Sequence, residues 1–297
     1  PQSGRRGCGQ SAVVVSMLVW LGAVPPAVMF LTQTTLGSTA SPGLIAVIAI
    51  ALTAALLILP SLAVMLLAHR RPGWRTTSAV AMCVVIIAGY LLLDAAVRAV
   101  FHSPTPALHG EGAWAAVVRL VVLVLYTILA ARLAARLAAS WLSSPGSAAE
   151  DAPRPSRSFG DWLGLNRFDL PTLLLALAVA ALVTLPWPVT GALGDSLTGL
   201  SLAFQTLAWV IPSLLLFWGV IRCLLDTVLA RPWVAALMTT LLFAMASFGS
   251  VLPTADWGAL VTIVSLLPLA FLLTELRARQ SGVYPLLPVF YCHRVAP

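Results

Sequence analysis

The chain has 297 residues, of which 60% are hydrophobic and 9% are charged, and its mean hydropathy is +0.98. A soluble domain carries roughly 25% charged residues, so a chain this apolar cannot cover itself with a polar surface in water. The formal net charge is +7, and all 17 residues counted as lysine or arginine are arginines. These features exclude a water-soluble domain, and no basic stripe with interleaved aromatic residues points to nucleic-acid binding.

The apolar residues form blocks of about 20, the length at which a helix crosses a hydrocarbon core of about 30 Å. In lipid every backbone amide and carbonyl needs a partner within the chain, and the short alternating strands of a membrane barrel are absent. The sequence therefore predicts an all-α, polytopic transmembrane bundle with eight or nine membrane segments. The expected segments are Ser11–Leu36 (interrupted by Pro25 and Pro26), Leu44–Ala68, Ser78–Phe101, Ala113–Leu137, Leu170–Val189, Leu200–Ile221, Pro232–Ser250, Trp257–Leu273 and a short, proline-broken Val283–Val295.

A polar stretch rich in Ser, Pro, Arg and Asp divides the chain between the fourth and fifth segments. We expect an N-terminal four-helix transmembrane region over 1–142, a linker over 143–168 and a second transmembrane region over 169–297. Fourteen of the seventeen arginines fall on one set of alternate loops and three on the other. By the positive-inside rule, the N-terminus and the linker face the cytoplasm.

Five ionisable residues fall inside or at the ends of apolar segments, where charge is costly and often functional. Asp94 and Arg98 are four residues apart, as are Arg222 and Asp226, and this spacing places each pair on one helix face. The simpler interpretation of both is a local ion pair near the membrane interface. Arg119 lies deeper in its segment, where it either extends toward the interface or neutralises Asp94 or a lipid headgroup.

The residue types that bind metals are scattered along the chain. None of the four histidines has a second histidine or a carboxylate at helical spacing, and the four cysteines lack the spacing of metal ligands. The sequence therefore predicts neither a metal site nor a cofactor.

From the linker onward the chain resembles a family of all-helical membrane proteins, the CAAX-protease and bacteriocin-processing (CPBP, or Abi) family. The lead-in Asp161–Arg167 is similar to its LGLRR stretch, and Leu215–Gly219 to its EExxFRG motif. Arg231–Ala236 through Leu242–Ser247 resembles the helix that ends in FxxxH, and Leu276–Gly282 the lead-in to HxxxN. The resemblance covers residues 160–297 and implies an intramembrane endopeptidase frame.

The chain departs from the family where the chemistry would be. In active members, two adjacent glutamates and two histidines activate a water. Ordinary Ser, Leu, Trp and Phe side chains supply no general base at neutral pH, so the resemblance implies a catalytically inactive member. The positions that correspond to the motif residues are Ser213 and Leu214 (the glutamates), Trp218 (the arginine), Ser247 and Phe290 (the histidines) and Arg294 (the asparagine).

Three functions stay open on the sequence. The first is a non-catalytic subunit or scaffold of a membrane complex in a bacterial inner membrane, with other membrane proteins, lipids or a pigment-like hydrophobe as partners. The second is an active CPBP-type endopeptidase with a displaced site built from His293, Glu275 and Ser247. The third is a small-solute transporter component that uses Asp94, Arg98 and Arg119.

Overall fold

The computed structural model describes residues 3–36, 42–69, 74–100, 111–142, 158–165, 207–229, 231–251, 267–268, 270–274, 277, 283 and 286. Over these ranges the chain is almost entirely helical and forms no strand, which confirms the all-α prediction. Five of the described helices are long and apolar enough to cross a membrane, which indicates an integral membrane protein. They are Ser11–Leu36, Ile48–Ala68, Arg75–Val97, Trp114–Trp141 and Leu207–Val228.

Three expected segments lie almost wholly outside the described residues. These are the fifth, eighth and ninth, so the total of eight or nine stays a prediction. The described residues group into two compact units that interleave along the chain. The first unit comprises Pro1–His102 and Val228–Phe271, and the second comprises Ser103–Thr227 and Leu272–Pro297. The division into 1–142 and 169–297 also stays a prediction, because most of the stretch around the linker is not described.

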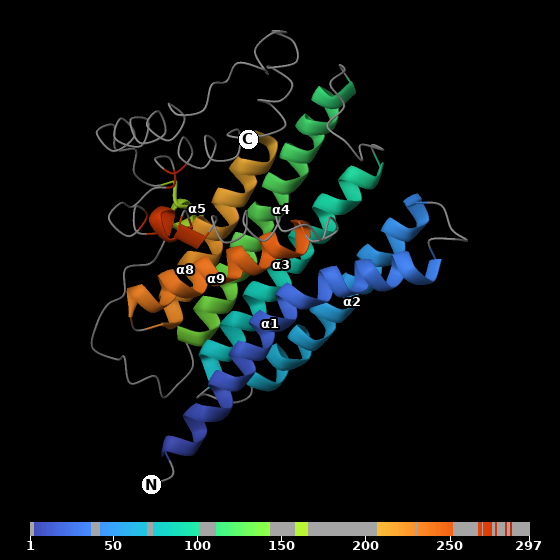
Figure 1. Cartoon of the computed structure of the whole chain (residues 1–297). Coiled ribbons are helices and arrows are strands. Elements are labelled where there is room, and N and C mark those ends of the chain that lie inside the picture. The colour runs from blue at the N-terminus through green and yellow to red at the C-terminus, as the bar shows by residue number, and fades with distance from the viewer. Residues whose placement is uncertain are drawn as a thin grey trace. The chain divides into compact units, whose positions relative to one another are not determined.

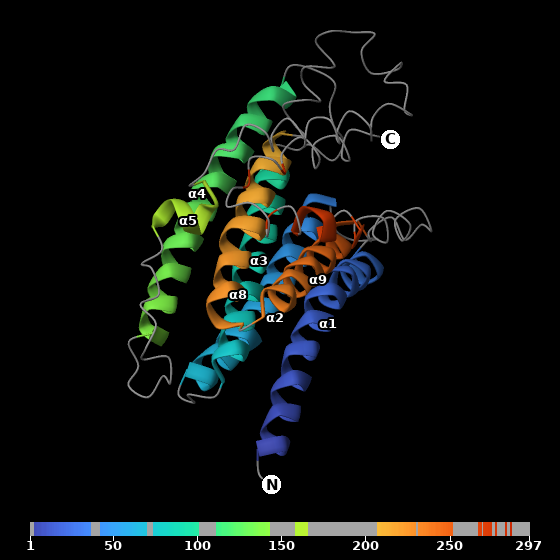
Figure 2. The ribbon, with the colours of Figure 1, turned by 90° about the vertical axis from the view of Figure 1, so that its left-hand side faces the viewer.

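The described part of the first unit includes the helices α1 (Ser3–Leu36), α2 (Pro42–His69), α3 (Arg75–Val100) and α9 (Pro232–Val251). Helix α2 packs along α3, and α1 contacts α2, α3 and α9, as Figures 1 and 2 show. Helix α3 has the most buried span of this unit and α2 the least, so α3 forms its centre and α2 turns most of its apolar surface outward.

Helix α1 runs without a break through Pro25 and Pro26, so the predicted interruption is wrong. Proline removes one amide donor and crowds the carbonyl four residues earlier, which normally ends or bends a helix. Membrane helices tolerate proline when neighbouring helices enclose the affected turn. Here α1 lies against three other helices, and the residues around the prolines, Leu21, Val24 and Val28, are buried.

The described elements of the second unit include α4 (Glu111–Leu142), α5 (Phe159–Leu163), the π-helix η2 (Leu215–Ile221) and α8 (Arg222–Val228). Helices α4 and α5 pack against each other and against η2. Residues 207–214, η2 and α8 form one continuous helical span, Leu207–Val228. Of the five candidate spans it is the most enclosed, with 78% of its most apolar window buried, so it forms the centre of this unit.

Two faces of α4 differ in residue size. Small alanines lie on its inner side, where they permit close helix packing, and a row of branched residues lies exposed at intervals of four. The buried alanines are Ala116, Ala130, Ala131, Ala134 and Ala138, which share the inner side with Leu123, Thr127 and Trp141, and the exposed row comprises Val117, Val121, Leu125, Leu129 and Leu133. The exposed row is suited to contact with lipid chains or with another apolar helix.

Candidate functional site

The span Leu207–Val228 carries five of the candidate residues named from the sequence. Ser213 and Leu214 are 1% and 2% exposed, and Trp218 is fully buried in η2. Arg222 and Asp226 follow on α8, where Arg222 is buried and Asp226 is partly exposed. The structure therefore places three of the six motif positions on one buried helix.

The middle of this span has a π-helical winding. In an α-helix the backbone amide of Arg222 would donate to the carbonyl of Trp218, four residues earlier. Here it donates to the carbonyls of Phe217 and Gly219 instead. The Trp218 carbonyl oxygen is thus displaced from its α-helical partner and becomes accessible to a side chain.

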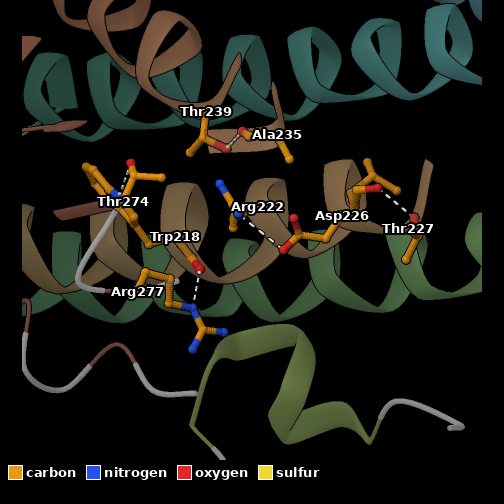
Figure 3. A network of polar contacts seen from close by, with 9 residues as sticks. Trp218, Arg222, Asp226, Thr227, Ala235, Thr239, Thr274 and Arg277 are labelled. Carbon is orange, nitrogen blue, oxygen red and sulfur yellow. Dashed lines mark hydrogen bonds and ion pairs between the residues drawn. The ribbon is translucent and has the colours of Figure 1, made fainter. Parts of the chain in front are cut away.

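Trp218 makes two polar contacts with the C-terminal part of the chain, both drawn in Figure 3. The Arg277 Nε donates to the Trp218 carbonyl oxygen at 3.1 Å. The Trp218 indole Nε1 donates to the Thr274 hydroxyl oxygen, also at 3.1 Å, and both of these side chains are buried. A buried indole usually needs an acceptor, and Thr274 supplies it.

The predicted ion pair between Arg222 and Asp226 is present. The Arg222 Nε lies 3.1 Å from the Asp226 Oδ2, and Figure 3 shows the two side chains turned toward each other. The side chain of Arg222 is 5% exposed and that of Asp226 is 30% exposed. The carboxylate therefore compensates a cation that has lost almost all of its hydration.

Arg277 lies in the same charged neighbourhood. Burial lowers the pKa of its guanidinium, Cys223 and Asp226 counter this effect, and Arg222 adds to it. Two arginines and an aspartate thus converge beside Trp218 and Thr274. We call Trp218, Arg222, Asp226, Thr274 and Arg277 the Trp218 cluster.

Helix α5 covers η2 and belongs to the stretch that we expected to be a polar linker. A capping box begins it: the Ser158 hydroxyl accepts from the Asp161 amide, and the Asp161 carboxylate accepts from the Ser158 amide. This reciprocal pairing satisfies two amides that a helix start leaves open. Trp162 and Leu163 are buried, so α5 is a docked element of the second unit.

Two glycines permit this docking. At Gly219 an added Cβ would lie 2.9 Å from the Leu163 carbonyl oxygen, so only glycine allows the two backbones to approach so closely. Gly164 ends α5 in the left-handed region, with φ of 71°. Its carbonyl accepts from the Val283 amide at 2.9 Å, which joins α5 to the C-terminal part of the chain.

The other candidate residues belong to other helices or lie outside the described part of the chain. Ser247 is buried on α9, and Asp94 is buried on α3, both in the first unit. Arg119 is partly buried on α4. The residues outside the description are Phe290, Arg294, His293, Glu275 and the side chain of Arg98.

Among the described residues, no group of three or more His, Cys, Asp or Glu side chains is placed to hold a metal ion. A scan against protein-family models, a search of curated proteins and a search of solved structures each found no match for this chain. The described residues of the cluster form a buried polar packing site in which two arginines lie near one aspartate.

Sequence reasoning did not select Thr274 or Arg277 as members of this cluster. From the sequence, Arg277 entered only the count of loop arginines and the stretch Leu276–Gly282 of the family resemblance. The motif Leu215–Gly219 includes Trp218 and the helical turn that surrounds it. The spacing of its residues does not predict that this turn is π-helical. Partners that are 56 and 59 residues from Trp218 cannot be found from local periodicity.

Proposed function

We propose that this chain is a non-catalytic membrane subunit with a degenerate CPBP-like frame, and that it acts as a scaffold for another membrane protein. The observation that carries the proposal is the state of Trp218. At the position of the motif arginine stands a fully buried indole; among the described residues near it, Arg277 is bonded to its backbone and Arg222 is ion-paired with Asp226. A group in this position packs and holds helices together.

The adjacent motif positions support the same function. Ser213 and Leu214 occupy the places of the two glutamates and are both buried. Leucine cannot transfer a proton, and a serine hydroxyl needs a neighbouring base before it acts as a nucleophile. A buried apolar side chain in this place stabilises the bundle, because it avoids the cost of placing a charge in a low-dielectric interior.

The exposed surface of α4 offers a place for a partner. Its row of branched residues at intervals of four is a continuous apolar surface that can contact lipid chains or the apolar face of another membrane helix. We propose eight or nine membrane segments in a bacterial inner membrane, with the N-terminus and the linker in the cytoplasm. This orientation follows from the arginine distribution and places α5 at the cytoplasmic side.

A site-specific photo-crosslinker tests the scaffold function in cells. We expect the reagent at Leu125 or Leu129, which are exposed, to capture one membrane protein in stoichiometric yield, and we expect none from the buried Leu123. Deletion of the captured protein should lower the abundance of this chain. Capture of lipid alone at both exposed positions would contradict the proposal.

A separate assay addresses catalysis. Ser213→Ala and Ser247→Ala should leave the abundance and assembly of the complex unchanged, because these hydroxyls have no reaction to perform. Cleavage of a tagged membrane substrate that is abolished by His293→Ala would instead establish a displaced protease site. Vesicle uptake that depends on Asp94 and Arg119 would establish a transporter.

A further inference from the structure

The winding of η2 is not dictated by its own sequence. The segment LLFWGVI contains no proline and only one glycine, and its residues are ordinary members of an α-helical membrane span. A π-helix is rare and usually appears as a single wide turn within an α-helix, often at functional sites. Its persistence here therefore needs a cause outside the helix.

The contacts of Trp218 supply that cause. Rewinding to an α-helix would direct the Arg222 amide toward the Trp218 carbonyl oxygen, which now accepts from Arg277. It would also turn the Trp218 side chain away from Thr274, its hydrogen-bond acceptor. Both partners belong to the short stretch 272–277, so one small part of the chain holds the π-helical winding from two sides.

We propose that η2 is a register switch in which Thr274 and Arg277 hold the π-helical state. When these two contacts are released, the span Leu207–Val228 rewinds to a continuous α-helix. A π-helical turn holds about one residue more than an α-helical turn. When the π-helical turn rewinds to an α-helix, the helix after Ile221 therefore rotates by about 100°, the angle of one α-helical residue, relative to the helix before η2. The inference does not depend on the scaffold function, because it concerns only contacts inside this chain.

The rotation has a defined effect on each residue of α8. Every residue after η2 moves to the angular position that the next residue holds in the π-helical state. Leu225, which is fully buried, moves to the position of the partly exposed Asp226. Cys223, which is 6% exposed, moves to the position of the fully buried Leu224. Rewinding thus exposes position 225 while position 223 stays buried, whereas unfolding would expose both.

Thiol labelling of the full-length protein in detergent micelles tests this rotation. The reporter is Leu225→Cys, labelled with a water-soluble maleimide and read by peptide mass spectrometry beside the native Cys223. With Thr274 and Arg277 intact, both thiols should react slowly. After Arg277→Ala, the loss of a charged hydrogen bond should raise the labelling rate at position 225 by about tenfold, and Cys223 should stay slow.

Two further variants make the outcome decisive. Arg231→Ala removes an exposed arginine and should leave both rates unchanged. Thr274→Val removes the indole acceptor with little change of shape and should accelerate position 225 in the same direction. The proposal is overturned when neither Arg277→Ala nor Thr274→Val accelerates position 225, and equally when both variants accelerate Cys223 together with it.

Discussion

The guanidinium of Arg277 binds the backbone of Trp218, 59 residues earlier in the chain, through a 3.1 Å hydrogen bond from its Nε to the carbonyl oxygen. The bond reaches a carbonyl that the π-helical turn has displaced from its α-helical donor. A buried peptide oxygen without a partner would be costly, so the arginine and the unusual winding stabilise each other. This relationship ties the C-terminal part of the second unit to its central helix.

The hydrogen bond between the Trp218 indole and Thr274 should be measurable as a coupling. Trp218→Phe leaves a buried threonine hydroxyl without its donor and should cost about 1–3 kcal/mol of unfolding free energy. Thr274→Val should cost a similar amount. Because one bond accounts for both losses, the double variant should be less destabilised than the sum of the singles, as a double-mutant cycle in mixed micelles would show.

Trp233→Phe provides the matched control for this cycle. Its side chain is 60% exposed, so the substitution should change the unfolding free energy by less than about 0.5 kcal/mol. Strict additivity of Trp218→Phe and Thr274→Val would contradict the assigned bond.

Two helical glycines should respond differently to alanine. At Gly219 the new Cβ meets the rigid backbone of Leu163, whereas at Gly22 it meets the Met245 sulfur at 2.7 Å, at the end of a flexible side chain. Both substitutions gain about 0.5–1 kcal/mol of helix preference. Gly219→Ala should nevertheless destabilise the protein by about 1–3 kcal/mol through overpacking, and Gly22→Ala should be close to neutral.

Limited trypsin digestion distinguishes the cause of the loss at Gly219. Displacement of α5 from η2 should accelerate cleavage within the linker 143–168, and Gly22→Ala should leave that rate at the wild-type value. Equal stability of the two alanine variants would show that the close backbone approach is unimportant.

Gly164 should be sensitive to alanine for two separable reasons. Its φ of 71° costs an L-residue about 1–2 kcal/mol, and an added Cβ would lie 2.8 Å from the Val283 Cγ1. In the Gly164→Ala, Val283→Ala double variant the clash with Val283 should be relieved, whereas the contact with the Arg277 guanidinium, at 3.1 Å, and the backbone part should remain. Thermal unfolding of the single and double variants, with Val283→Ala as the reference, measures the two parts.

The ion pair on α8 should stabilise the fold chiefly by compensating the charge of the buried Arg222. Asp226→Asn keeps the shape of the side chain but leaves the Arg222 charge without its carboxylate. We expect a loss of about 1–3 kcal/mol, below the cost for a fully buried pair because Asp226 is partly exposed. Chemical unfolding at low and high salt measures this loss, with Arg231→Ala as an exposed-charge control. A change below about 0.5 kcal/mol would place the pair among ordinary surface ion pairs.

Several features could be predicted from local sequence because their physical causes are local. The span Ser11–Leu36 has the bounds that its run of apolar residues predicts. The pair Arg222 and Asp226 follows from helical spacing alone, since residues four apart are neighbours on one face. The burial of Ser213 and Leu214 also follows from their place inside an apolar block.

Other features depended on contacts between distant parts of the chain. The predicted break at Pro25 and Pro26 is absent, and α1 contacts three other helices, with Leu21, Val24 and Val28 buried beside the prolines. The docked helix α5 arises inside a stretch whose composition predicts only a polar linker, because Trp162 and Leu163 find a surface on which to pack.

By itself, the sequence determined a chain of apolar helices, because hydrophobic length and backbone hydrogen bonding in lipid leave few alternatives. Only the tertiary structure decided that Trp218 lies in a π-helical turn with Thr274 and Arg277 as its partners. The physical reason is that the displaced carbonyl bonds to whichever donor the fold brings within reach. Periodicity along the chain does not predict which distant arginine will lie next to it.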